Sequence, residues 1–214
     1  MHLDLWKQSP GSVADAVWAN TELRSLVLAD NGLNEISPKI GRLSRLRMLD
    51  LGHNHLTQLP ESLGELTGLT DFLYLQDNRL DSLPGSLGHL ANLRYLNISE
   101  NAFASFPEAV FGMLRLVELR ASDNQLVSIP AAVGALSHLR ELHLRNNRIT
   151  SVPEAIGQLA ELRILDLRAN PLTHLPDSVA ALPRLEKLDL RWVTTLVLPT
   201  SFAELEARGC LIYR

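Results

Sequence analysis

The sequence predicts an α/β solenoid: a curved right-handed superhelix with a parallel sheet on its concave face and short α or 3-10 helices on its convex face. Three observations support this fold class. Leucine accounts for 45 of the 214 residues, a bias typical of a repeated template. The pattern LxxLxLxxNxLxxLPxxLGxLxx recurs along the chain. Its asparagines are spaced by 23, 24, 23, 23, 23 and 23 residues, at Asn31, Asn54, Asn78, Asn101, Asn124, Asn147 and Asn170.

The first half of each repeat is predicted to be a strand with one buried face. In "LRELHLRNN" (139–147), Leu142 and Leu144 alternate with polar residues, which is the period of a half-buried strand. The asparagine that follows the strand can use its side-chain amide to satisfy backbone groups of the turn and of adjacent repeats.

The second half of each repeat is predicted to be a short helix. In "VPEAIGQLAEL" (152–162), Val152, Ile156 and Leu159 recur at helical spacing. A proline opens this half, and we expect it at the first helical position, where its missing N–H costs nothing. One repeat cannot bury its own leucines, so stacked neighbours must share one continuous core.

These motifs resemble the leucine-rich-repeat family, in its 23-residue subclass, over essentially all 214 residues. The resemblance implies one domain of about nine repeats, with a degenerate first repeat (1–22), a degenerate last repeat (185–209) and a final strand (210–214). We expect Leu211 and Tyr213 of that strand to face inward. The family includes bacterial proteins, among them secreted effectors, and intracellular signalling adaptors. It implies a non-enzymatic module that binds a protein partner through its concave face, as a bacterial effector or an intracellular scaffold.

Composition limits the other functional classes. The net charge of −4 disfavours a general nucleic-acid binder, which needs a concentrated basic surface. The opening "MHLDLWKQSPGS" lacks the features of a signal peptide, and no apolar run approaches the ~20 residues that span a bilayer. We therefore expect no membrane insertion, and a protein that is cytoplasmic or is secreted without a cleaved signal. A monomer is expected, although the strand edge at the N-terminus could dimerise.

An aromatic group is the first candidate binding surface. Strand residues between the buried leucines must face the concavity, and in three consecutive repeats these include Met48, Phe72, Tyr74 and Tyr95. Exposed aromatic clusters are typical binding hot spots. The alternative is that these rings only cover the sheet and contact each other.

The stretch "LTDFLYLQDN" (69–78) carries one residue more than the other repeats. Counted back from Asn78, Leu73 and Leu75 stay in phase with the template and Leu69 does not. We expect the extra residue near the strand start, as a β-bulge that places Phe72 beside the two tyrosines. The alternative is a neutral insertion in a tolerant loop.

Charged residues form the second candidate surface, towards the C-terminal half of the concave face. Its acidic members are Glu141, Asp166 and Asp189. The arginines could fork onto carboxylates of a partner, or they could pair with these acids across neighbouring repeats, as a solvated lattice of little energetic value. The basic members are Arg120, His143, Arg145, Arg168 and Arg191.

No catalytic residue, metal site or cofactor is predicted. The recurrent glycines occupy one repeat position and do not form a phosphate-binding loop. His53 and His55 have no third ligand in phase, and Cys210 has no activating neighbour. The alternative function is a substrate-recruiting or regulatory part of a larger ubiquitin-ligase or GTPase system.

Overall fold

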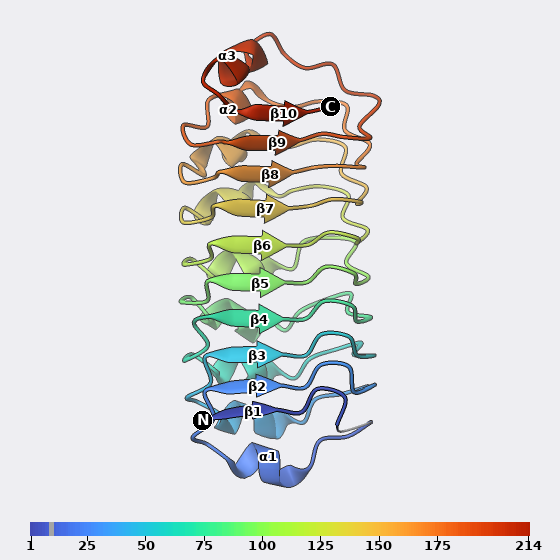
Figure 1. The fold of residues 1–214 in the computed structure, drawn as a ribbon, viewed down its shortest axis with the longest axis vertical. Helices are drawn as coiled ribbons and strands as arrows, with labels where there is room; N and C mark the ends of the chain where they lie inside the picture. Colours follow the sequence, from blue (N-terminus) through green and yellow to red (C-terminus); the bar gives the residue numbers. More distant parts are fainter. Residues whose placement is uncertain (9–10) are drawn as a thin grey trace.

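In the computed structural model, which describes residues 1–8 and 11–214, ten parallel strands form one open sheet in sequence order (Figure 1). Each strand has three residues, and its middle residue is a leucine or isoleucine that packs against the core. The strands are β1 (His2–Asp4), β2 (Ser25–Val27), β3 (Met48–Asp50), β4 (Phe72–Tyr74), β5 (Tyr95–Asn97), β6 (Glu118–Arg120), β7 (Glu141–His143), β8 (Ile164–Asp166), β9 (Lys187–Asp189) and β10 (Leu211–Tyr213). The predicted α/β leucine-rich-repeat solenoid is confirmed.

Short helices lie behind the sheet, one to a repeat (Figure 1). Among the residues that the structure describes, six are 3-10 helices and the others are short α-helices near the two ends. They are α1 (Asp15–Ala19), η1 (Pro38–Arg42), η2 (Glu61–Glu65), η3 (Gly85–His89), η4 (Glu108–Gly112), η5 (Ala131–Ala135), η6 (Glu154–Gln158), α2 (Asp177–Ala180) and α3 (Phe202–Ala207).

The repeat proline usually stands one residue before its helix. Pro60 is the N-cap of η2, with extended backbone (φ −73°, ψ 145°), and its carbonyl accepts the first helical hydrogen bond from Leu63 N (3.0 Å). The expected first helical position is therefore wrong for this proline. In η1 the same position is taken by Ser37, which is the N-cap, and Pro38 follows it as the first helical residue. The N-cap position suits proline because its fixed φ matches the extended entry into the helix.

The buried asparagines link successive repeats, as predicted. Asn54 Nδ2 donates to the carbonyls of Leu51 (2.9 Å) and Gly52 (3.0 Å) in its own turn, and of Leu28 (3.1 Å) in the preceding repeat. Its Oδ1 accepts from Leu33 N (3.0 Å). One side chain thus satisfies backbone groups on two repeats that burial would leave unpaired.

A left-handed residue precedes each asparagine position. All nine have φ between 51° and 64°, and none is glycine. Aspartate and asparagine tolerate this conformation best, which explains why acids recur there. The nine are Lys7, Asp30, His53, Asp77, Glu100, Asp123, Asn146, Ala169 and Trp192.

The extra residue of the third full repeat is taken up just before β4. Leu69 stays fully buried, although it is out of phase in the sequence. The N–H groups of Asp71 and Phe72 both approach the carbonyl of Arg47 (2.9 and 3.4 Å), and Thr70 O accepts from Arg94 N (3.1 Å). Strand β4 keeps full register with β3 and β5, so the insertion does not disturb the sheet.

The expectation for the final strand is wrong. Leu211 pairs with Lys187 and Tyr213 with Asp189, which places both on the open face of the sheet, 58% and 40% exposed. Cys210 faces the core instead. The interval from Lys187 to Leu211 is 211 − 187 = 24 residues, one more than the template assumes.

The ends of the stack differ from its middle. Leu3 and Leu5 of the first repeat are only partly buried against the core, because β1 is an edge strand. In the described part of the chain, no helix is both long enough and apolar enough to cross a bilayer.

Candidate functional site

Three aromatic rings meet on the open face of the sheet, where the sequence predicts them. The ring of Phe72 stacks on that of Tyr74 at 5.8 Å between centroids, with the planes 10° apart. Tyr95 lies 5.5 Å from Phe72 and 5.0 Å from Tyr74 in tilted geometry. Met48 faces Phe72 across the β3–β4 pair. We call these four residues the aromatic patch.

The aromatic patch is exposed to solvent, although its rings are partly packed against the sheet and each other. Phe72 is 42% exposed, and the two tyrosines are half-buried beside it. Burial raises the pKa of Tyr95 to about 12. Burial also raises the pKa of Tyr74, and the Asp50 carboxylate adds to that shift. Both hydroxyls therefore remain protonated at neutral pH and can donate hydrogen bonds to a ligand.

A hollow of about 230 Å³ opens beside two of these rings. It combines an apolar wall with charges of both signs, so it can take a side chain that has an apolar body and a polar end. Its lining residues are Asp71, Phe72, Arg94, Tyr95, Val117 and Glu118.

The predicted arginine ladder pairs with acids of this same chain, mostly along single strands. Arg168 forks onto Asp166, with Nε 2.8 Å from Oδ1 and Nη2 2.5 Å from Oδ2. Arg191 holds Asp189 in the same way, at 2.9 and 2.8 Å. These pairs lie within the chain, but they differ from the solvated pairing across repeats that the second interpretation expects, because most join residues of one repeat and two of the acids are buried. A bidentate fork is the strongest arrangement of this ion pair.

The remaining arginines of the ladder also have carboxylate partners. Arg120 Nε donates to Glu118 Oε1 on the same strand (2.5 Å). Arg145 reaches the preceding repeat, where Nη2 donates to Asp123 Oδ2 (2.7 Å). We call these pairs, together with those of Arg168 and Arg191, the charge lattice.

Two of the lattice acids, Asp166 and Asp189, are buried and ionised. Asp166 is 4% exposed and Asp189 is 0% exposed. Burial acts to raise the pKa of Asp166, but the neighbouring His143 and Arg168 outweigh it and hold that pKa well below its usual range. Burial likewise opposes the ionisation of Asp189, and the hydrogen bonds from Arg191 lower its pKa overall.

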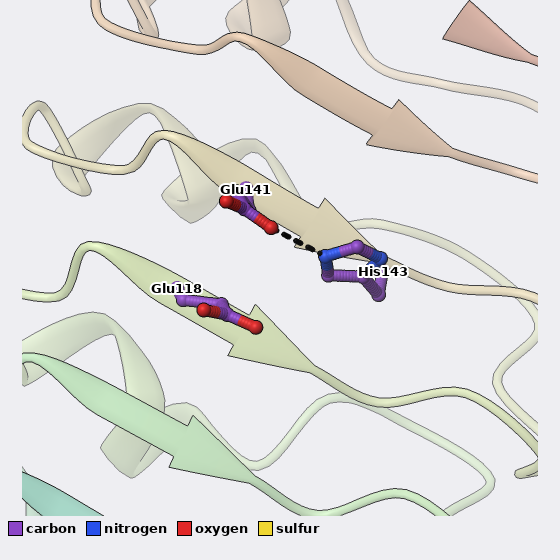
Figure 2. Close-up of side chains that lie close together, drawn as sticks. All are labelled: Glu118, Glu141 and His143. Carbon is purple, nitrogen blue, oxygen red and sulfur yellow. Dashed lines mark hydrogen bonds and ion pairs between the residues drawn. The ribbon is translucent and has the colours of Figure 1, made fainter. Parts of the chain in front are cut away.

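Figure 2 shows Glu118 on β6 beside Glu141 and His143 on β7. One ligand atom from each lies within 4.8 Å of the others, so the three could contribute to a divalent-metal site. Each already has a partner: His143 Nε2 lies 3.0 Å from Glu141, and Glu118 accepts from Arg120. The sequence does not predict this group, because its members come from two repeats. The pairing of β6 with β7 brings them together.

A second aromatic group, near the C-terminus, is not predicted from the sequence. The ammonium of Lys187 lies 5.1 Å from the Tyr213 ring centre, and the Arg191 guanidinium lies 5.4 Å from it. Arg191 also lies 5.8 Å from the Trp192 ring centre. Val193 replaces the asparagine that marks the repeat, so the sequence offers no point from which to count the register of β10.

Sequence comparison identifies the family of the chain. A model described as "Leucine rich repeat" matches residues 21–80 and 71–126, and one described as "Leucine-rich repeat region" matches residues 125–207. The chain belongs to the leucine-rich-repeat family. Domains of this family are generally non-catalytic modules for protein interaction. None of the curated proteins compared with this leucine-rich-repeat chain matches it.

Solved structures share the fold of this leucine-rich-repeat chain over nearly its whole length. A leucine-rich-repeat protein of Leptospira interrogans is 27% identical, with a TM-score of 0.79 over 97% of this chain and 58% of that one. A TDR receptor is 27% identical, with a TM-score of 0.83 over 100% of this chain and 40% of the receptor.

A third structure was solved with a bound partner. The ectodomain of the Arabidopsis thaliana membrane receptor kinase GASSHO1/SCHENGEN3, in complex with CASPARIAN STRIP INTEGRITY FACTOR 2, is 29% identical, with a TM-score of 0.73. It is matched over 94% of this chain and 28% of its own length. The present chain thus spans between 28% and 58% of these three structures.

Proposed function

We propose that this leucine-rich-repeat protein is a non-enzymatic recognition module that binds a protein or peptide partner on the open face of its sheet, with the aromatic patch as the main contact. One observation carries the proposal. Three rings touch one another on that face, and the core is already filled by leucines, so the fold does not need them.

The chemistry of the patch favours it over the charge lattice as the main source of affinity. Aromatic rings bury a large area and lose little conformational entropy on binding, and tyrosine adds a hydrogen-bonding group. The lattice arginines would have to give up or share their own carboxylates before they could bind those of a partner. We therefore assign Arg120, His143, Arg145, Arg168 and Arg191 a secondary role, in which the four arginines orient the partner through long-range charge.

The wider context of the module stays a prediction. A bacterial effector and an intracellular scaffold both fit a monomeric module of this kind. The competing proposal is a substrate-recruiting or regulatory part of a larger enzyme system. The natural gene discriminates between them: an open reading frame that continues into a catalytic domain favours the second.

The test is a peptide-display selection on the wild-type protein, followed by calorimetry of the enriched peptides. The decisive variant is Tyr74→Ala/Tyr95→Ala, and we expect at least a tenfold loss of affinity, because truncating a hot-spot aromatic residue costs about 2 kcal/mol or more. Tyr213→Ala is the matched control, since it removes an exposed tyrosine from the same face at the far end of the stack. Peptides that bind the double variant and the wild type equally would refute the role of the patch.

A further inference from the structure

All ten strands start at the same edge of the solenoid (Figure 1). Two columns of residues lie along this edge, just before the strands. Each column takes one residue from each successive repeat. The first column contains Glu22, Arg45, Gly68, Asn92, Arg115, His138, Glu161 and Arg184. The second column contains Arg24, Arg47, Asp71, Arg94, Val117, Arg140, Arg163 and Glu186.

Towards both ends of these columns, arginines pair with an acid of the adjacent repeat. This pairing neutralises them and leaves little free positive charge. The pairs are Arg45 with Glu22 (2.5 Å), Arg47 with Asp71 (3.1 Å), Arg163 with Glu186 (2.6 Å), and Arg184 with Glu161.

In the middle of the columns the acids are missing. Among residues 1–8 and 11–214, no carboxylate oxygen lies within 4.0 Å of a guanidinium nitrogen of Arg94, Arg115 or Arg140. Val117 occupies the position next to Arg94 where an acid would pair with it. Asn92 and His138 flank Arg115, and Arg115 Nη1 lies 3.3 Å from His138 Nε2.

These three arginines line one hollow of about 620 Å³. In the described part of the chain, three arginines with no carboxylate oxygen within 4.0 Å of their guanidinium nitrogens thus line one hollow, although the net charge is −4. The one acid at its border, Glu161, is held by Arg184. The hydrogen-bonding residues of the hollow are Asn92, Arg94, Arg115, Ser137, His138 and Arg140.

The ligand must be an anion that can use several guanidinium groups at once. A carboxylate has one charge and two oxygens, and a single arginine fork satisfies it. A phosphoryl group carries a charge of about −1.5 to −2 and three strong acceptor oxygens, which suits three arginines that line one hollow from three repeats. We propose that Arg94, Arg115 and Arg140 form a binding site for a phosphoryl group.

The neighbouring hollow indicates how such a group could be carried. It shares Arg94 and Val117 with the arginine hollow, and its other walls include the rings of Phe72 and Tyr95. An aromatic or apolar body attached to the phosphoryl group can therefore rest against those rings while the phosphoryl oxygens meet the arginines.

The experiment titrates the whole protein with inorganic phosphate and with phenyl phosphate, at constant ionic strength, and follows amide and arginine Nε–H signals by NMR. We expect saturable shifts at the three arginines, and binding weakened about tenfold or more by Arg115→Gln or Arg140→Gln, since each removes charge-assisted hydrogen bonds. Tighter binding of phenyl phosphate supports a phosphomonoester ligand. Equal binding of the two supports recognition of the phosphoryl group alone.

Arg24→Gln is the matched control. Arg24 stands in the same column as Arg140 and is exposed, but it lies outside the hollow, so its loss should leave the titration unchanged. Circular dichroism of each variant checks that the fold is kept. No saturable shift with either probe, or equal weakening by Arg24→Gln and Arg115→Gln, would overturn the proposal. Neither probe tests peptide binding at the aromatic patch, so failure here leaves the proposed function standing.

Discussion

Asp50 and Asp166 occupy the same repeat position on two parts of one sheet, and their carboxylates behave in opposite ways. Both accept a hydrogen bond from the backbone N–H two residues later, at 2.9 Å from Gly52 and 3.2 Å from Arg168. Burial raises the pKa of Asp50, and the Gly52 amide only partly offsets it. The pKa of Asp166 lies below its usual range, because His143 and Arg168 outweigh the effect of burial.

The residue two positions later accounts for much of this difference. In the aromatic region that residue is Gly52, which has no side chain to pair with the acid, and in the charge lattice it is Arg168. The lattice therefore contributes stability through its own ion pairs. The aromatic patch lies beside Asp50, a carboxylate whose ionisation burial disfavours. Its apolar rings, and not this acid, are the groups that gain from being covered by a partner.

Asp166→Asn gives the largest expected effect on this comparison. It removes the carboxylate onto which Arg168 forks and leaves that guanidinium only its longer contact with Asp189 (Nε to Oδ2, 3.6 Å). We expect the free energy of unfolding at pH 7 to fall by about 2 kcal/mol. This is less than for a fully buried ion pair, because the Arg168 side chain is 22% exposed. Urea unfolding followed by circular dichroism measures the change.

A second substitution, at Arg168, provides the control for Asp166→Asn. Adding Arg168→Gln to the Asp166→Asn variant removes the guanidinium that has lost its main partner. The double variant should therefore recover part of the lost free energy of unfolding. A free energy of unfolding that is unchanged by Asp166→Asn would show that the fork contributes nothing, as many surface ion pairs do.

Lowering the pH should reduce the contribution of the charge lattice to the free energy of unfolding. The pKa of Asp166 is lowered in the folded protein, so its contribution is fully present above the unfolded value of about 3.9 and is lost as pH falls towards the folded value. The stability gap between wild type and Asp166→Asn should therefore shrink by about 1 kcal/mol or more from pH 7 to pH 3, because asparagine does not titrate. Urea midpoints at several pH values would reveal this convergence, and a constant gap would contradict it.

The sequence predicts the sheet face well where asparagine gives a reference point for counting. The spacing of the asparagines defines the register of the central strands, so counting along the sequence is enough to place Met48, Phe72, Tyr74 and Tyr95 together. The extra residue of the third full repeat is no obstacle, because Asn78 follows it and shows where the template resumes.

Two features could not be predicted in the same way. The final strand has no asparagine, and Cys210, Leu211, Ile212 and Tyr213 are all apolar in character, so neither spacing nor alternation decides which face they take. The acid with which each lattice arginine pairs depends on the rotamer that the arginine adopts. The side chain can lie along its own repeat or reach a neighbouring repeat. The recurrent Asp-Leu-Arg at 166–168 and 189–191 places acid and base on one side of a strand and does permit the fork.

Asp50→Asn should give the smallest effect, and its sign should be opposite to that of Asp166→Asn. Because the folded pKa of Asp50 is raised, its contribution to stability is present below the unfolded value and is lost as pH rises through the folded value. At pH 7 the ionised Asp50 carboxylate therefore slightly lowers the free energy of unfolding. The asparagine amide removes this charge and keeps a side-chain oxygen that can accept the hydrogen bond from Gly52 N–H. We expect the free energy of unfolding to stay the same or to rise by up to about 1 kcal/mol, measured by the same urea titration. If Asp50→Asn lowered the free energy of unfolding as much as Asp166→Asn does, the two carboxylates would contribute equally to stability. The difference between the surroundings of the aromatic patch and the charge lattice would then have no energetic consequence.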